Sequence, residues 1–302
     1  MLNDLTSGRD IIRLTEDLLK RADAAGRWPT PVNDIVEAAE LEESDESPFD
    51  AWVLARAPKH LRKAIALVNS SRVRAVLDRR ERTVHLDPAI EHAGRRSFLR
   101  LHETSHDLFP WQQELAYADD DATLSPATNR LFEQEANQGA AEILFQGSRF
   151  GQMANEYRIG VAAVSELSGN VGASLQATLR RYAETHRAAV CGLVLDASPI
   201  DRQPLSYRRR EASQSPAWTE RFGRSWFPVL SEDCYPFISA IARANSPAPL
   251  ETVVAWPDLN CEPVDVRAEA ISNRFGHLLL LWVPRRETFK RRRTLAVGGR
   301  TA

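Results

Sequence analysis

The chain has 302 residues, of which 43% are hydrophobic and 26% are charged, and its formal net charge is −2 at pH 7. This composition is that of a globular protein and excludes a disordered chain. The longest apolar runs have the length of a strand, which excludes a membrane span. The small net charge gives no general attraction to nucleic acid.

The start of the chain and its cysteines indicate the compartment. The first ten residues are polar and acidic, without the basic start and apolar core of a signal peptide. The three cysteines are widely spaced and odd in number, so they cannot form a full disulfide framework. We therefore expect a protein of the reducing cytoplasm with no membrane partner.

The first part of the chain combines predicted helices with short strands. Apolar residues at helical spacing predict a helix over residues 11–25, and Thr30-Pro31 is a typical cap for a second helix that reaches residue 39. The acidic segment 42–48 is predicted to be a loop. Short β-branched stretches then predict strands over residues 64–68, 75–77 and 83–86, with a hairpin turn at 79–82.

Helices dominate the middle of the chain. One is predicted over residues 95–109, ended by Pro110, and the next begins at Ser125-Pro126 and reaches Gln146, where Gly147 stops it. Further helices are predicted over residues 150–157, 161–167 and 173–186. After residue 188 the composition changes, with strands predicted over 190–195 and 278–283 and many prolines and tryptophans between them.

These changes predict an α+β protein in several parts. Residues 1–147 are expected to form a mainly helical domain with a small β-sheet, and residues 148–188 a separate helical segment. Residues 189–286 are expected to form a C-terminal α/β domain. The basic end, residues 287–302, is predicted to be a disordered tail.

A short motif in the helix over 95–109 predicts a metal site. Residues 102–106 read His-Glu-Thr-Ser-His, and positions i and i+4 of a helix lie on one face. The imidazoles of His102 and His106 can therefore reach one cation, with Glu103 beside them to take a proton from an attacking water. So short a pattern also arises by chance on surface helices, and catalytic zinc takes a third protein ligand.

The next helix offers three glutamates for the third position. Glu133 shares its face with Asn137 one turn later, followed by small and apolar residues suited to close helix packing. We predict Glu133 as the third Zn²⁺ ligand and the amide of Asn137 as the group that supports a ligand. Glu135 and Glu142 are the alternatives, and a solvated helix face accounts for both of them.

Segments 102–106 and 133–141 together resemble the ImmA/IrrE family of bacterial metallopeptidases. The likeness extends upstream to Pro31-Val32-Asn33 and to the strand over 83–86, and downstream through the helices to about residue 186. The resemblance implies a zincin-like catalytic domain and the cleavage of a helix-turn-helix (XRE-type) repressor protein. Such cleavage would release stress-response or mobile-element genes.

The same resemblance assigns roles to individual residues. It implies that His102, His106 and Glu133 bind Zn²⁺ and that Glu103 is the catalytic base. The chain departs from many family members around the second histidine, where it has Ser105 and Asp107. Asp107 either faces solvent or contacts the edge of a histidine.

The helical segment 148–188 admits two interpretations. Its arginines, Arg180, Arg181 and Arg187, would contact phosphates in a DNA-binding helix-turn-helix. Alternatively, the segment is a platform that packs on the catalytic domain or holds the substrate, which the interspersed glutamates favour. The rival to a peptidase is accordingly a transcriptional regulator that binds DNA itself and has a vestigial metal site.

The C-terminal part is similar in position and length to a domain of the same family. In IrrE-like members a GAF-like sensor domain occupies the place of residues 189–286. The tryptophans of this part are expected to belong to a core.

Overall fold

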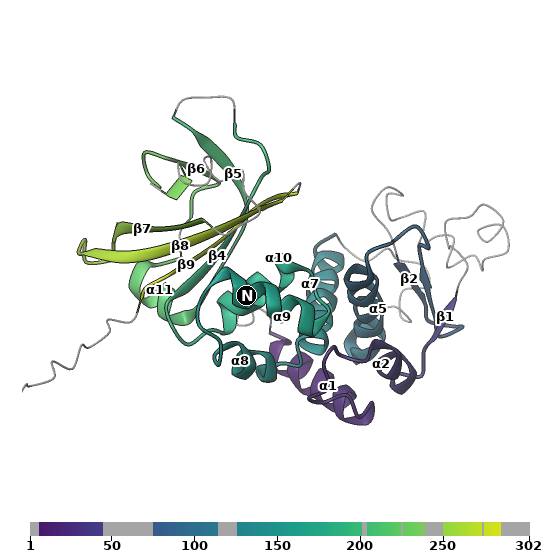
Figure 1. Cartoon of the computed structure of the whole chain (residues 1–302). Coiled ribbons are helices and arrows are strands. Elements are labelled where there is room, and N and C mark those ends of the chain that lie inside the picture. Colours follow the sequence, from purple (N-terminus) through teal and green to yellow (C-terminus); the bar gives the residue numbers. More distant parts are fainter. Residues whose placement is uncertain are drawn as a thin grey trace, which may run out of the picture.

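The structure is a computed structural model that describes residues 6–44, 75–113, 126–200, 204–224, 226–235, 237–238, 250–273 and 275–284. It is an α+β protein in which a body of helices with a small sheet adjoins a larger antiparallel sheet (Figure 1). The strand predicted over 64–68, the residue Ser125 and the predicted tail 287–302 lie outside the described residues.

Helices and a small sheet form the described portion of the N-terminal part. Its helices include α1 (Gly8–Arg21), α2 (Val32–Ala38), α5 (Ala93–Leu108) and α7 (Pro126–Leu144). The sheet has the order β1-β3-β2, made of β1 (Glu42–Ser44), β2 (Ala75–Asp78) and β3 (Thr83–Leu86). Helices α5 and α7 lie side by side (Figure 1), and α5 also contacts β2 and β3.

The small sheet corrects one prediction and confirms another. The hairpin of β2 and β3 is present, with antiparallel pairing of Ala75 with Leu86. The predicted loop at 42–48 is wrong for its first residues, because Glu42–Ser44 pairs in parallel with Thr83–His85. Within the described residues, β2 is an edge strand, which leaves one side of its backbone unpaired with any strand.

Thr30, which was predicted to cap α2, connects the start of α2 to the end of α7. Thr30 does not cap α2, whose N-cap position is Pro31 without a side-chain bond. Its hydroxyl instead donates to the carbonyl of Leu144, at 2.9 Å, where α7 ends. Gly147 stops α7 as predicted: its φ is 57°, and its N–H donates to the carbonyl of Glu142 at 3.0 Å.

The helical segment 148–188 packs into the same core as the N-terminal part. It contains α8 (Ser148–Ala154), α9 (Val161–Val171) and α10 (Leu175–Thr185). One hydrophobic core runs from Leu101 of α5 through Phe150 of α8 and Leu167 of α9 to Val190 in the large sheet. This core therefore includes residues on both sides of positions 147 and 188, and we call the helical segment between them the platform.

The large sheet is antiparallel throughout, with the order β6-β5-β4-β9-β8-β7. Its strands are β4 (Val190–Leu195), β5 (Ser206–Gln214), β6 (Val229–Ser231), β7 (Leu250–Pro257), β8 (Pro263–Asn273) and β9 (Gly276–Trp282). The central strand β4 is buried along its whole length because both faces of the sheet are covered. Its side chains alternate between a core shared with α9 and α10 and a second core that includes Trp218 of α11 (Pro216–Phe222).

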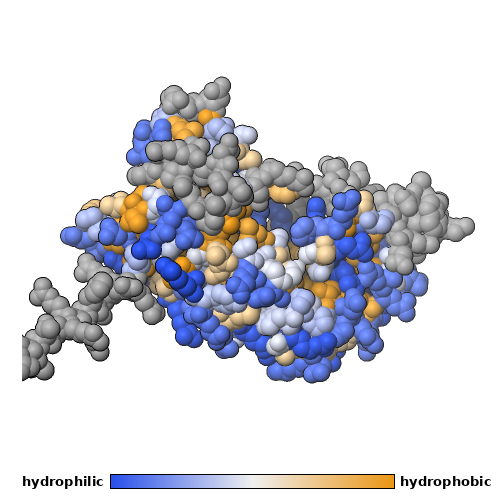
Figure 2. Space-filling model, in the orientation of Figure 1, coloured by the Kyte–Doolittle hydropathy of each residue, from blue (hydrophilic) through white to orange (hydrophobic). Residues whose placement is uncertain are grey.

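Three tryptophans of the C-terminal part pack together, whereas Trp282 belongs to the core shared with the helices. The rings of Trp218, Trp226 and Trp256 lie 5.3 to 6.4 Å apart in the second core. The three cysteines are free thiols. No helix in the described part of the chain combines the length and the apolar character needed to cross a membrane. Hydrophilic side chains cover most of the visible face of α1 and α2 (Figure 2).

Candidate metal centre

Helix α5 carries both histidines of the motif. His102 and His106 lie one turn apart on the same face of the helix, with their Nε2 atoms 3.2 Å from each other. The histidine side chains are only 10% and 14% exposed. His106 is in the last turn, two residues before the helix ends at Leu108.

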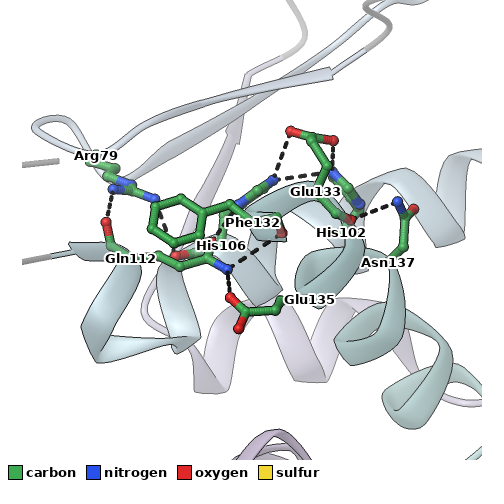
Figure 3. Close-up of polar contacts among 8 residues, drawn as sticks. All are labelled: Arg79, His102, His106, Gln112, Phe132, Glu133, Glu135 and Asn137. Carbon is green, nitrogen blue, oxygen red and sulfur yellow. Dashed lines mark hydrogen bonds and ion pairs between the residues drawn. The ribbon is translucent and has the colours of Figure 1, made fainter. Parts of the chain in front are cut away.

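Helix α7 brings Glu133 to both imidazoles (Figure 3). Its Oε2 lies 3.3 Å from Nε2 of His102, and its Oε1 lies 3.5 Å from Nε2 of His106. Ligand atoms around a tetrahedral zinc at about 2.0–2.1 Å stand roughly 3.3 Å from one another. The three residues predicted as ligands therefore come together, with ligand atoms all within 4.8 Å, in a group that could hold a metal ion.

The charges of this group favour a cation. Hydrogen bonds from His102 and His106 hold the pKa of the Glu133 carboxyl well below its usual range. Burial lowers the pKa of His106, but the hydrogen bond to Glu133 and the charge of Glu103 outweigh it, so that this pKa is raised overall. In the absence of a metal the nearby carboxylates thus favour the protonated form of His106, and a divalent cation would take over the role of that proton.

Glu103 lies buried next to the three ligand side chains. Burial raises the pKa of its carboxyl above the ordinary value, and the nearby His106 and His102 oppose this only in part. The backbone N–H of Leu77, in the edge strand β2, donates a hydrogen bond to the carboxylate. A carboxylate with a raised pKa is a better proton acceptor near neutral pH.

The amide of Asn137, which was predicted to support a ligand, contacts the backbone of Glu133. Its Nδ2 donates to the backbone carbonyl of Glu133, at 2.7 Å, on the exposed side of α7. A polar contact to a ligand ring comes instead from Gln112, whose Oε1 lies 2.7 Å from Nδ1 of His106 (Figure 3). Gln112 follows the end of α5, where no helical pattern in the sequence links it to the motif.

The two alternative glutamates are not on a solvated face, and that prediction is wrong. Glu135 and Glu142 are each only 3% exposed. Glu135 accepts hydrogen bonds from Nε1 of Trp111 and Nε2 of Gln112, both at 2.8 Å. Glu142 forms an ion pair of 2.8 Å with Arg181 of α10. Both carboxylates are satisfied away from the three ligand atoms.

Small residues let α5 and α7 approach closely. Ser105, one of the departures noted in the motif, faces Gly139 of α7. A Cβ atom at position 139 would lie 2.7 Å from Oγ of Ser105 and 2.6 Å from Cζ of Phe109. The other departure, Asp107, is buried and pairs with Arg82 at 3.0 Å, so it does not simply face solvent.

Gly139→Ala is expected to destabilise the fold, whereas Gly169→Ala in α9 is expected to stabilise it slightly. Overpacking costs about 1–3 kcal/mol, while alanine in an open helical position is better than glycine by up to about 1 kcal/mol. Position 169 has no neighbouring atom within 4 Å of an added Cβ. Urea unfolding of both variants measures the difference, and equal effects would contradict the close packing of α5 on α7.

Two of the three arginines proposed to contact phosphates form ion pairs within the protein. Arg181 is buried against Glu142, and Arg180 pairs with Glu211 of β5. The backbone N–H of Arg187 donates to Asn155 at 3.0 Å. The pairs of Arg180 and Arg181 favour the platform interpretation over phosphate contacts by these residues.

No family model and no curated protein matches this sequence. The structure is similar to that of a Mycobacterium tuberculosis transcriptional regulator, with a TM-score of 0.52 and 9% sequence identity. The similarity covers 91% of this chain and 76% of the other chain. It shows a shared α+β fold.

Proposed function

We propose that this chain is a zinc-dependent endopeptidase. The observation that carries the proposal is the convergence of His102, His106 and Glu133, with one ligand atom from each within 4.8 Å of the others, and with Glu103 buried beside them. Two imidazoles and a carboxylate form a ligand set of catalytic zinc that leaves a further position open. When bound, zinc supplies a Lewis acid that polarises a substrate carbonyl and lowers the pKa of water to about 7.

Glu103 is the proton carrier in this proposal. Its carboxylate takes a proton from the attacking water and delivers it to the nitrogen of the leaving amine, so that the base is restored after each cleavage. The hydrogen bond from the Leu77 N–H orients the carboxylate. His102, His106 and Glu133 hold the metal and take no part in the proton transfer.

The position of the edge strand β2 favours a substrate that binds in an extended conformation. Its outer side is not paired with any described strand, and its Leu77 N–H reaches Glu103. Exposed strand edges bind extended peptides through backbone hydrogen bonds. A peptide segment paired along β2 would therefore present its backbone beside the base.

The substrate class rests on the family resemblance of segments 102–106 and 133–141. We propose a helix-turn-helix (XRE-type) repressor as the substrate, with cleavage releasing the genes that it controls. The same resemblance leads us to propose a zincin-like fold for the catalytic part and a GAF-like sensor role for the large sheet. We also propose that the protein acts in the cytoplasm.

The alternative is a regulator that binds DNA itself and whose metal site is vestigial. The solved structure similar to this chain is named a transcriptional regulator, which belongs to that class. Arg180 and Arg181 are already paired with Glu211 and Glu142, which disfavours the helical segment as the DNA-binding element. The retention of Glu103 also disfavours a vestigial site.

Incubation with candidate repressors separates the two functions. The zinc-loaded chain is mixed with each repressor encoded nearby, and the products are identified by intact mass; binding to the corresponding promoter DNA is measured in parallel. Cleavage at a defined bond is the expected result. Tight, salt-dependent DNA binding without cleavage would favour the regulator.

His102→Ala is expected to weaken zinc binding more than about 100-fold, because loss of a ligand exceeds the 10–100-fold cost of losing a group that supports one. His277→Ala, in the large sheet, serves as the control. Competition with a chromogenic chelator measures both affinities. Equal zinc affinity in the two variants would exclude His102 as a ligand.

A further inference from the structure

A buried carboxylate lies behind the metal centre without a cationic partner among the described residues. Glu135 is on α7, two residues after Glu133, and points to the other side of the helix. It accepts hydrogen bonds from the hydroxyl of Ser7, from Nε1 of Trp111 and from Nε2 of Gln112. All three of these groups are donors, so the carboxyl oxygens of Glu135 act as acceptors toward each of them.

This carboxylate determines how the amide of Gln112 is turned. Gln112 is fully buried, and its Nε2 faces Oε2 of Glu135 at 2.8 Å and the carbonyl of Phe132 at 3.4 Å. Both of these groups are acceptors, so an amide turned by 180° would set its oxygen against two other oxygens. The Nε2 must therefore face α7, and Oε1 must face His106 (Figure 3).

The amide in turn determines which nitrogen of His106 is free to bind a metal. Oε1 of Gln112 is an acceptor only and lies 2.7 Å from Nδ1 of His106. Nδ1 must therefore carry the hydrogen, and the lone pair of the neutral ring is left on Nε2. Nε2 is the atom that faces His102 and Glu133.

We propose that Glu135 and Gln112 are positioning residues of the metal centre, with Glu135 fixing the amide of Gln112 and the amide presenting Nε2 of His106 as the ligand. The inference rests on the proposed function only in that the site binds zinc. Groups that hold the second ring nitrogen of a ligating histidine raise metal affinity by about 10–100-fold.

Zinc affinity in four variants tests the proposal, measured by competition with a chelator. Gln112→Leu and Glu135→Leu are each expected to bind zinc about 10–100-fold more weakly than the wild type. The double variant is expected to bind no more weakly than Gln112→Leu, because Glu135 acts through the amide. Glu135→Gln, which keeps an acceptor oxygen for Gln112, is expected to retain most of the affinity.

Glu142→Gln is the matched control, since Glu142 is on the same helix and equally buried but pairs with Arg181. It is expected to bind zinc like the wild type even where it lowers the thermal stability. Wild-type affinity in folded Gln112→Leu and Glu135→Leu, or a double variant weaker by the product of both losses, would overturn the proposal.

The protonation of the His106 ring can be measured on the wild type, so this test does not depend on whether a variant folds. Long-range ¹H–¹⁵N NMR of the histidine rings in the zinc-loaded chain is expected to show a protonated Nδ1 on His106. A protonated Nε2 would overturn the proposal. If zinc binds with these properties but no repressor is cleaved, the proposed peptidase function fails while the positioning roles stand.

Discussion

Glu103→Gln is expected to slow repressor cleavage by about 10²–10⁴-fold, the usual contribution of a general base. Glutamine has the shape of glutamate, and its carbonyl oxygen can accept the hydrogen bond that the Leu77 N–H donates. It cannot take a proton from the attacking water. The three ligand side chains are unchanged, so zinc affinity should stay within a few-fold of the wild type.

Single-turnover cleavage followed by intact mass gives the rates, and chelator competition gives the zinc affinity. Glu156→Gln, which neutralises an exposed carboxylate beyond α8, is the control and should cleave like the wild type. A Glu103→Gln protein that cleaves within ten-fold of the wild type would remove Glu103 from the mechanism. Loss of zinc together with activity would assign Glu103 to metal binding instead.

Arg181→Met is expected to lower the free energy of unfolding by about 3–5 kcal/mol, because it leaves a buried carboxylate without a partner. Two nitrogens of Arg181 bond the two oxygens of Glu142 at 2.8 and 2.9 Å, and the side chains are 7% and 4% exposed. This pair joins α10 of the platform to the C-terminal end of α7, the helix that carries Glu133.

Arg149→Met provides a control with the same geometry and different burial. Arg149 bonds both oxygens of Glu16 at 2.8 Å, but the two side chains are 32% and 31% exposed. Both ion pairs line one cavity of about 640 Å³. A partly exposed pair contributes only about 0.2–1 kcal/mol. Denaturant unfolding of both variants measures the contrast, and equal losses would show that burial does not set the strength of these pairs.

Local patterns in the sequence predicted much of the fold. Residues 190–195 are a continuous apolar run, and the strand has these bounds because both of its faces are covered. The strand at Glu42–Ser44 could not be predicted, since it is polar and forms only by parallel pairing with β3. Threonine is a residue type that often caps helices, but the hydroxyl of Thr30 donates to the carbonyl of Leu144, far away in the sequence.

At the metal centre, too, local patterns could be predicted from the sequence, whereas contacts between distant residues could not. The spacing of His102 and His106 and the helical face of Glu133 indicated side chains that the structure brings together. The surroundings of Glu135 could not be read from the sequence, because its partners Trp111 and Ser7 are 24 and 128 residues away. Helical periodicity gives the face of a residue but does not give what packs against that face.

Addition of zinc to the metal-free chain in the presence of a candidate repressor tests the central claim most directly. Intact mass of the repressor is followed as one equivalent of zinc is added. The proposed peptidase predicts two fragments that sum to the repressor plus one water, formed only with zinc and not by Glu103→Gln. Zinc binding without fragments from any repressor, or fragments that form equally in the presence of chelator, would contradict it.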